Sequence, residues 1–142
     1  MEESLNNNIL EYFGIEKKNI NTYSALTLAY IGDAIFDLVI RSIIVGRGNT
    51  KPAKLHYKAS RIVKASSQAL MIEAIKEQLS EEEISIYKKG LNAKPATTAK
   101  NASYKEYRKA TGFETLLGYL YLNGNMSRIY EITKLALETI DE

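Results

Sequence analysis

The sequence predicts an all-helical fold, and three observations lead to that prediction. The chain of 142 residues contains only two prolines and eight glycines, so few positions interrupt a helix. Alternating apolar and polar positions, which are typical of a half-buried strand, are scarce. The length fits one domain, residues 1–142, whose core needs no disulfide or structural metal. Residues 1–20 are expected to form a loosely packed N-terminal extension of that domain.

Helix caps and breakers predict where each element begins and ends. Thr22 or Ser24 can cap the second helix, and Ser80 with Glu83 matches a capping box. The stretch "LNGN" predicts a left-handed stop before the last helix, and a short break is expected near Lys58. The predicted helices span residues 4–13, 22–46, 52–57, 59–79, 81–91, 103–122 and 126–140.

The composition excludes several classes of chemistry and of location. The chain has no cysteine and one histidine, His56, which excludes thiol chemistry, cysteine-rich zinc sites and mechanisms that need two histidines. We expect His56 to be a packed or surface residue rather than a catalytic base. Residues 1–10 lack the regions of a secretory signal, and no apolar run reaches membrane-spanning length. We therefore expect a soluble, cytoplasmic protein with no membrane partner.

The formal net charge of +2 conceals two strongly basic segments. Residues 41–64 hold seven bases and no acid, and residues 88–109 hold seven bases and one acid, Glu106. If the two segments fold side by side, they form a positive face for a phosphate backbone. For either segment alone, a solvated lysine surface is the simpler interpretation. The presence of two such segments favours nucleic acid as the partner.

Two acids stand inside apolar helical stretches, each close to glycine. Asp33 follows Gly32 in "TLAYIGDAIFDLVI", and Glu114 lies between Gly112 and Gly118 in "ATGFETLLGYLYL". A helical glycine costs about 1 kcal/mol, and a buried carboxylate costs several unless it is paired. Glycines on crossing helices permit close approach, which would bring the two acids together. Taken singly, each acid fits a hydrogen bond to a neighbouring helix end about equally well.

A pair of carboxylates in one cleft predicts a particular chemistry. Their repulsion is relieved by a shared proton or by a hard divalent cation, and Mg²⁺ fits best. A basic face beside such a site predicts metal-assisted phosphodiester hydrolysis. Asp37, one turn after Asp33, is expected to pair with Arg41 rather than to act as an outer ligand.

Three ordered stretches resemble a known family. They are "LAYIGDAIFDLVIR", "TKPAKLHYKASRIVKASSQA" and "GLNAKPATTAKNASYKEYRKATGFETLLGYLYL". Together they resemble Mini-ribonuclease III, the compact branch of the ribonuclease III family that lacks a double-stranded RNA-binding domain, over residues 25–137. The resemblance implies an all-helical ribonuclease III endonuclease domain that acts as a homodimer, with Mg²⁺, on double-stranded RNA. It also implies the 23S ribosomal RNA precursor as the substrate.

The resemblance assigns roles to three residues. Asp33 in "YIGDA" and Glu114 in "TGFETLLG" match the catalytic, metal-binding acids of the family. Tyr30 stands where the larger enzymes place an aromatic residue that helps two subunits dock.

The chain also departs from the larger enzymes, which carry further acids in both motifs. Leu26, Ala29 and Thr111 stand at those positions here. The number of metal ions, and a contact of Thr111 through water, are therefore left open.

The basic segments are expected to bind RNA in place of the missing domain. Residues 94–105 look like a loop that enters a groove of A-form RNA, where shape is read through phosphates and 2′-hydroxyls. The candidate RNA-binding residues are Arg61, Lys64, Lys94, Lys100, Lys105 and Arg108. A two-fold dimer would place two active sites across one duplex.

Two other classes of function are compatible with the sequence. A non-catalytic duplex-RNA-binding or ribosome-assembly protein would retain the fold without the chemistry, and a helical adaptor would use the basic face for a partner. The exact RNA target, the cleavage positions and the need for an assisting ribosomal protein are left open.

Overall fold

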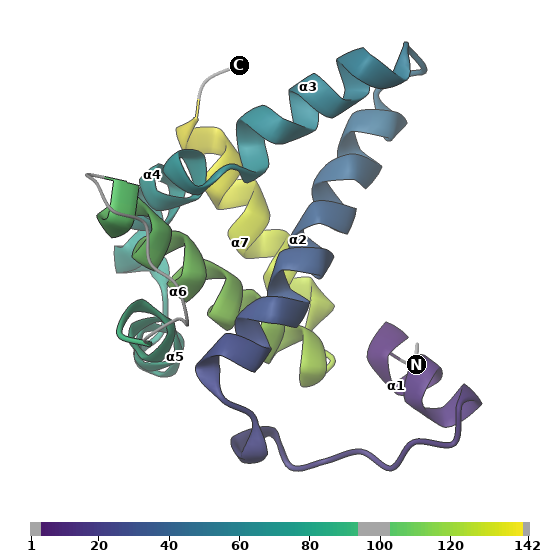
Figure 1. Cartoon of the computed structure of the whole chain (residues 1–142), viewed down its shortest axis with the longest axis vertical. Helices are drawn as coiled ribbons and strands as arrows, with labels where there is room; N and C mark the ends of the chain where they lie inside the picture. The colour runs from purple at the N-terminus through teal and green to yellow at the C-terminus, as the bar shows by residue number, and fades with distance from the viewer. Residues whose placement is uncertain (1–3, 94–102, 141–142) are drawn as a thin grey trace.

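Helices surround one central helix, α6, in the computed structural model, which describes residues 4–93 and 103–140 (Figure 1). Every regular element in those two ranges is helical, so the predicted all-helical class is confirmed. The α-helices are α1 (Leu5–Tyr12), α2 (Ala25–Gly46), α3 (Pro52–Val63), α4 (Ala65–Ile75), α5 (Glu81–Leu91), α6 (Ser103–Leu122) and α7 (Met126–Thr139). Two 3-10 turns, η1 (Ile20–Thr22) and η2 (Lys76–Gln78), precede α2 and α5. No helix within this described part of the chain has the length and apolarity to cross a membrane.

The core forms where α6 packs against α2, α4, α5 and α7. Phe36 of α2 and Phe113 of α6 meet edge to face, with ring centroids 5.3 Å apart. Both rings are fully buried, and aromatic pairs in this arrangement stabilise a core beyond the area that they bury. The largest fully buried aliphatic residues around them are Ile40, Met71, Ile72, Ile75, Leu116, Leu117, Ile129 and Ile132. Because α6 is covered by four helices, its mostly buried stretch, residues 110–121, forms the centre of the fold.

Most of the predicted helix ends are present. Ser24 is the cap of α2, and its Oγ accepts a hydrogen bond from the Thr27 amide at 3.1 Å. The predicted capping box of α5 is confirmed, since Ser80 Oγ accepts from the Glu83 amide and Glu83 Oε1 accepts from the Ser80 amide. Gly124 adopts a positive φ of 75° between α6 and α7, which is the left-handed stop that "LNGN" predicts.

The predicted break near Lys58 is wrong. Helix α3 continues through that residue to Val63, and the chain turns at Lys64, whose backbone is extended with φ −67° and ψ 156°. No glycine or proline marks this turn in the sequence. Its position is decided instead by side chains of the next helix.

Two polar side chains of α4 satisfy the last carbonyl groups of α3. Ser67 Oγ donates to the Arg61 carbonyl oxygen, and Gln68 Nε2 donates to the Val63 carbonyl oxygen at 2.8 Å. The last carbonyls of a helix have no partner within the helix, so these bonds stabilise the end of α3 at the turn. The turn of residues 62–65 is consequently a defined structural junction between α3 and α4.

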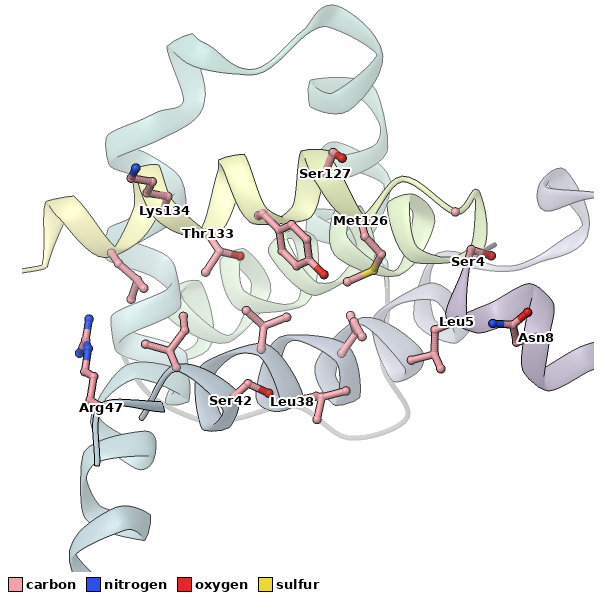
Figure 2. Close-up of a pocket in the computed structure, with 16 residues that line it drawn as sticks. Ser4, Leu5, Asn8, Leu38, Ser42, Arg47, Met126, Ser127, Thr133 and Lys134 are labelled. Atoms are coloured by element: carbon pink, nitrogen blue, oxygen red, sulfur yellow. The ribbon is translucent and has the colours of Figure 1, made fainter. Parts of the chain in front are cut away.

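Helix α1 stands apart from the bundle in Figure 1. It closes one end of a groove of about 1120 Å³ that runs between α2 and α7. Figure 2 shows Leu38 and Ser42 of α2 on one side of this groove, with Met126 and Thr133 of α7 on the other. The two acids singled out in the sequence belong to a different cleft.

Candidate active site

The backbones of α2 and α6 touch where their glycines meet. A Cβ atom at Gly32 would overlap the carbonyl oxygen of Glu114, and a Cβ atom at Gly118 would overlap the carbonyl oxygen of Leu28. Only glycine permits such close approach of two backbones. The predicted crossing is therefore present at these two glycines.

Gly112 takes part in a different contact, so its predicted role at the α2 crossing is wrong. A Cβ atom there would lie 2.6 Å from the Tyr87 ring on α5. Across the same contact, Gly90 of α5 faces the side chain of Thr115. Gly112 and Gly90 thus allow α5, rather than α2, to approach α6 closely.

The crossing brings Asp33 and Glu114 into one cleft of about 380 Å³. Asp33 is exposed at its mouth, whereas Glu114 is half-buried. The pKa of Glu114 is raised to about 8, mainly by burial of its carboxyl and secondly by the charge of Asp33. In the absence of a cation, the Glu114 carboxyl therefore retains its proton near neutral pH.

Gln68 forms a hydrogen bond with the carboxyl group of Glu114. Its Nε2 donates to Glu114 Oε2 at 3.1 Å, which opposes the rise in the pKa of Glu114. Gln68 is only 1% exposed, and no described residue provides a hydrogen-bond partner for its Oε1. The sequence interpretation did not select Gln68. The only feature of the sequence that could have pointed to Gln68 is its polar side chain next to the apolar positions of "QALMIEAI".

The oxygen groups of the cleft fit a hard divalent cation. Thr111, which is 8% exposed, lines the same cleft as the two carboxylates and Gln68. Magnesium and calcium prefer oxygen ligands, and the repulsion between Asp33 and Glu114 provides a reason to bind one. Within residues 4–93 and 103–140, no group of three or more acidic, histidine or cysteine side chains gathers.

The remaining wall of the cleft carries apolar side chains. Leu26 and Ala29 of α2 line it, and these are the two α2 positions at which the resemblance implies acids in the larger enzymes. Tyr30 stands at its rim with 81% of its surface exposed, and Tyr107 of α6 is also partly exposed there. We call Leu26, Tyr30 and Tyr107 the exposed rim; of these three, Tyr30 alone is the residue for which the resemblance implies a subunit contact.

Two cations of the RNA-binding set gather beside the acid cleft. Arg61 and Lys64 surround a hollow of about 300 Å³ together with Arg47 and Lys58. We call these four residues the basic hollow. Arg47 and Lys58 were counted in the basic segment but were not selected as site residues, because they come close to the others only when α2, α3 and α4 pack together.

The other four candidates for RNA binding differ in their environments. Lys94 and Lys100 lie outside the described residues. Lys105 is exposed in the first turn of α6. Arg108 is half-buried and donates to the Leu91 carbonyl oxygen at 2.8 Å and to Asn92 Oδ1 at 2.9 Å. Its guanidinium thus stabilises the C-terminal end of α5, in addition to any contact with RNA.

The two remaining polar residues take the places expected of them. Asp37 forms an ion pair with Arg41 at 2.9 Å, as the spacing of four residues predicted. His56 is exposed on α3, where its Nε2 lies 3.3 Å from Ser60 Oγ. The imidazole is therefore a surface group, which is one of the two positions expected for it.

Known proteins match most of this chain. The pattern of the Ribonuclease III domain family matches residues 26–125. A Mini-ribonuclease 3 of Clostridium tetani is 45% identical over 127 residues, which cover 89% of this chain and 84% of that protein. A Mini-ribonuclease 3 of Enterococcus faecalis is 45% identical over 84% of this chain and 92% of its own length. A crystal structure of a Fusobacterium nucleatum protein superposes with a TM-score of 0.75 at 33% identity, covering 85% of this chain and 97% of that chain.

Proposed function

The chain belongs to the ribonuclease III family, in its Mini-ribonuclease 3 group, and is an endoribonuclease for double-stranded RNA; we propose that it cuts with Mg²⁺ held by Asp33 and Glu114. The observation that carries the proposal is the meeting of these two carboxylates at the α2–α6 glycine crossing. Burial and, second, the charge of Asp33 raise the pKa of Glu114, and a divalent cation relieves the repulsion between the two carboxylates. If the two acids served only in structural ion pairs, a cationic side chain would line the cleft beside them, and the described residues that line it include no lysine or arginine.

The protein groups prepare the cleft for hydrolysis of a phosphodiester. A bound divalent cation supplies Lewis-acid polarisation and stabilisation of developing negative charge. Glu114 must release its proton to become a ligand, and Asp33 presents its carboxylate at the open mouth of the cleft. The apolar wall of Leu26 and Ala29 limits the number of carboxylates that share the site.

The RNA backbone is proposed to cross the α3–α4 junction. Val63 and Ala65 line the acid cleft, whereas Ile62 and Lys64 line the basic hollow. The two surfaces thus meet at a single turn of four residues. A phosphate chain that crosses this turn can contact the cations of the basic hollow while another phosphate lies at the acids.

A homodimer and a ribosomal substrate complete the proposal. The exposed rim of Leu26, Tyr30 and Tyr107 offers apolar surface beside the cleft, and a second copy of the chain would cover it. A two-fold dimer places two acid clefts on one duplex, one for each strand. Within the class of duplex RNAs we propose the 23S ribosomal RNA precursor, processed in the cytoplasm, because the chain falls in the Mini-ribonuclease 3 group.

Cleavage with a matched pair of variants tests this function. Purified protein is incubated with a generic RNA duplex and with a precursor stem of 23S ribosomal RNA, in Mg²⁺ or in chelator. We expect discrete products in Mg²⁺ only, a loss of about 100-fold or more in rate for Asp33→Asn, and near-normal cleavage for Asp37→Asn. Asp37 is the control because it lies one turn away and pairs with Arg41.

Two outcomes would contradict the proposal. If the wild type binds duplex RNA but cuts neither substrate, the chain is an RNA-binding protein without chemistry. If Asp33→Asn cuts as fast as the wild type in the same Mg²⁺, the acid pair is not the site of hydrolysis.

A further inference from the structure

Gln68 is the only residue that joins the acid pair to the α3–α4 junction through hydrogen bonds in the described part of the chain. Its Nε2 bonds Glu114 Oε2 on α6 and the Val63 carbonyl oxygen at the end of α3, at 3.1 Å and 2.8 Å. The two N–H groups of the amide are thereby both used. A buried amide costs free energy unless such bonds compensate for its lost hydration.

The orientation of the amide follows from its partners. The opposite orientation would turn Oε1 toward the Val63 carbonyl oxygen, setting two acceptors against each other. Nε2 must therefore face Val63 and Glu114, and Oε1 is left without a partner among the described residues. The acceptor Oε1 is left unbonded within this part of the chain although Gln68 is only 1% exposed, so the two donor contacts determine the orientation of the amide.

The bond to Val63 stabilises the end of α3, whereas the bond to Glu114 is not needed for that end. Capping of α3 is shared with Ser67, which bonds the Arg61 carbonyl oxygen. An apolar side chain of similar length would fill the space at position 68 and leave the cap of Ser67 in place. The amide adds a donor for Glu114, whose other neighbour in the cleft, Asp33, has the same charge when ionised.

We propose that Gln68 is a positioning residue for divalent-cation binding: it fixes one oxygen of the Glu114 carboxylate so that the other oxygen is presented to the cation beside Asp33. The inference rests on the proposed function. Groups that orient a metal ligand by hydrogen bonding affect metal affinity about 10- to 100-fold when they are removed. The same bond links the cation site to the junction that adjoins the basic hollow.

Metal titration of three proteins tests this role. The wild type, Gln68→Met and Ser67→Ala are each titrated with Mg²⁺, and the rise in Tm of the RNA-free protein is measured. Methionine keeps the length of glutamine without its amide. Ser67→Ala is the matched control, because it removes the neighbouring cap of α3 without touching Glu114.

We expect the half-saturating Mg²⁺ concentration to rise about tenfold or more in Gln68→Met and to stay unchanged in Ser67→Ala. Cleavage of duplex RNA should show the same shift in Mg²⁺ dependence, with kcat recovering toward the wild-type value at saturating Mg²⁺. A general loss of stability would lower Tm in both variants without moving the metal titration of either one.

The contrary outcomes separate this inference from the function on which it rests. If the wild type responds to Mg²⁺ and Gln68→Met has the same half-saturating concentration, the positioning role is overturned and the function stands. If the wild type shows neither a Tm response nor cleavage in Mg²⁺, both are overturned. If Gln68→Met does not fold, Gln68→Asn, whose amide is one methylene shorter, replaces it with the same expected and contrary results.

Discussion

Glu114 is a carboxyl group whose surroundings change its protonation. Its carboxyl is half-buried beside Asp33, and burial and that charge raise its pKa to about 8. The unfolded chain ionises this carboxyl near 4.5. Between these two values the folded protein holds a proton that the unfolded chain has released, so folding stability falls as the pH rises.

This linkage predicts a pH-dependent difference between the wild type and Glu114→Gln. Without metal, the wild type should lose stability relative to the variant between about pH 5 and about pH 8, by at most about 1.4 kcal/mol per pH unit. Urea unfolding across that range measures the difference. Glu83→Gln is the control, because Arg128 lowers the pKa of Glu83 and its ionisation lies below this range. Equal pH slopes for the wild type and Glu114→Gln would refute the prediction.

At the scale of elements, α3 and the turn that follows it bring cations to the acid cleft. Arg61 and Lys64 are exposed and share the basic hollow with Arg47 and Lys58. The hollow exists because the chain turns at Lys64, where α4 side chains complete the end of α3. A continuous helix through this region would have distributed the same cations along its length.

The double substitution Arg61→Gln with Lys64→Gln should weaken RNA binding. We expect the slope of log affinity against log salt to decrease by about one for each lost phosphate contact. Duplex binding at several salt concentrations, measured in the presence of chelator so that no cutting occurs, provides the slope. Arg41→Gln serves as the control, since Arg41 pairs with Asp37 instead. A slope unchanged in the double variant would remove the hollow from the RNA-binding surface.

At the scale of the whole molecule, the acid cleft opens beside exposed apolar surface. Tyr30 is 81% exposed at the rim, beside the exposed Leu26 and Tyr107, and a second copy of the chain would remove this apolar surface from water. The groove between α2 and α7 also exposes an aromatic residue, Tyr130, at 56%. Tyr30 therefore marks the proposed dimer face, and Tyr130 marks a different exposed surface that serves as the control.

Tyr30→Ser should shift the protein from dimer to monomer and lower the rate of duplex cleavage, whereas Tyr130→Ser should leave both unchanged. Light scattering at a series of protein concentrations reports the oligomeric state. Because Tyr30 is an exposed side chain, we expect little change in the Tm of the dissociated monomer. A wild type that stays monomeric at all concentrations, or a dimer indifferent to Tyr30→Ser, would contradict the proposed arrangement.

Interactions between neighbours in the chain made much of this molecule predictable. The helical class, the cap at Ser24, the capping box of α5 and the Asp37–Arg41 pair all involve residues at most four positions apart. Propensity, capping and charge spacing act over that range. The acids at the crossing were also identified, because glycine beside a carboxylate in an apolar helix has a cost that calls for an explanation.

The sequence by itself determined the helices, most of their ends and the acids that belong together, since each leaves a mark in a short stretch of residues. The tertiary structure alone decided the turn at Lys64, the contact of Gly112 with Tyr87, and the basic hollow. It also decided the bond from Gln68 to Glu114, which joins residues 46 positions apart. Such contacts depend on how helices pack. The role of a buried polar side chain depends on its bonding partner, which can be far away in the sequence and cannot be identified from the neighbouring residues.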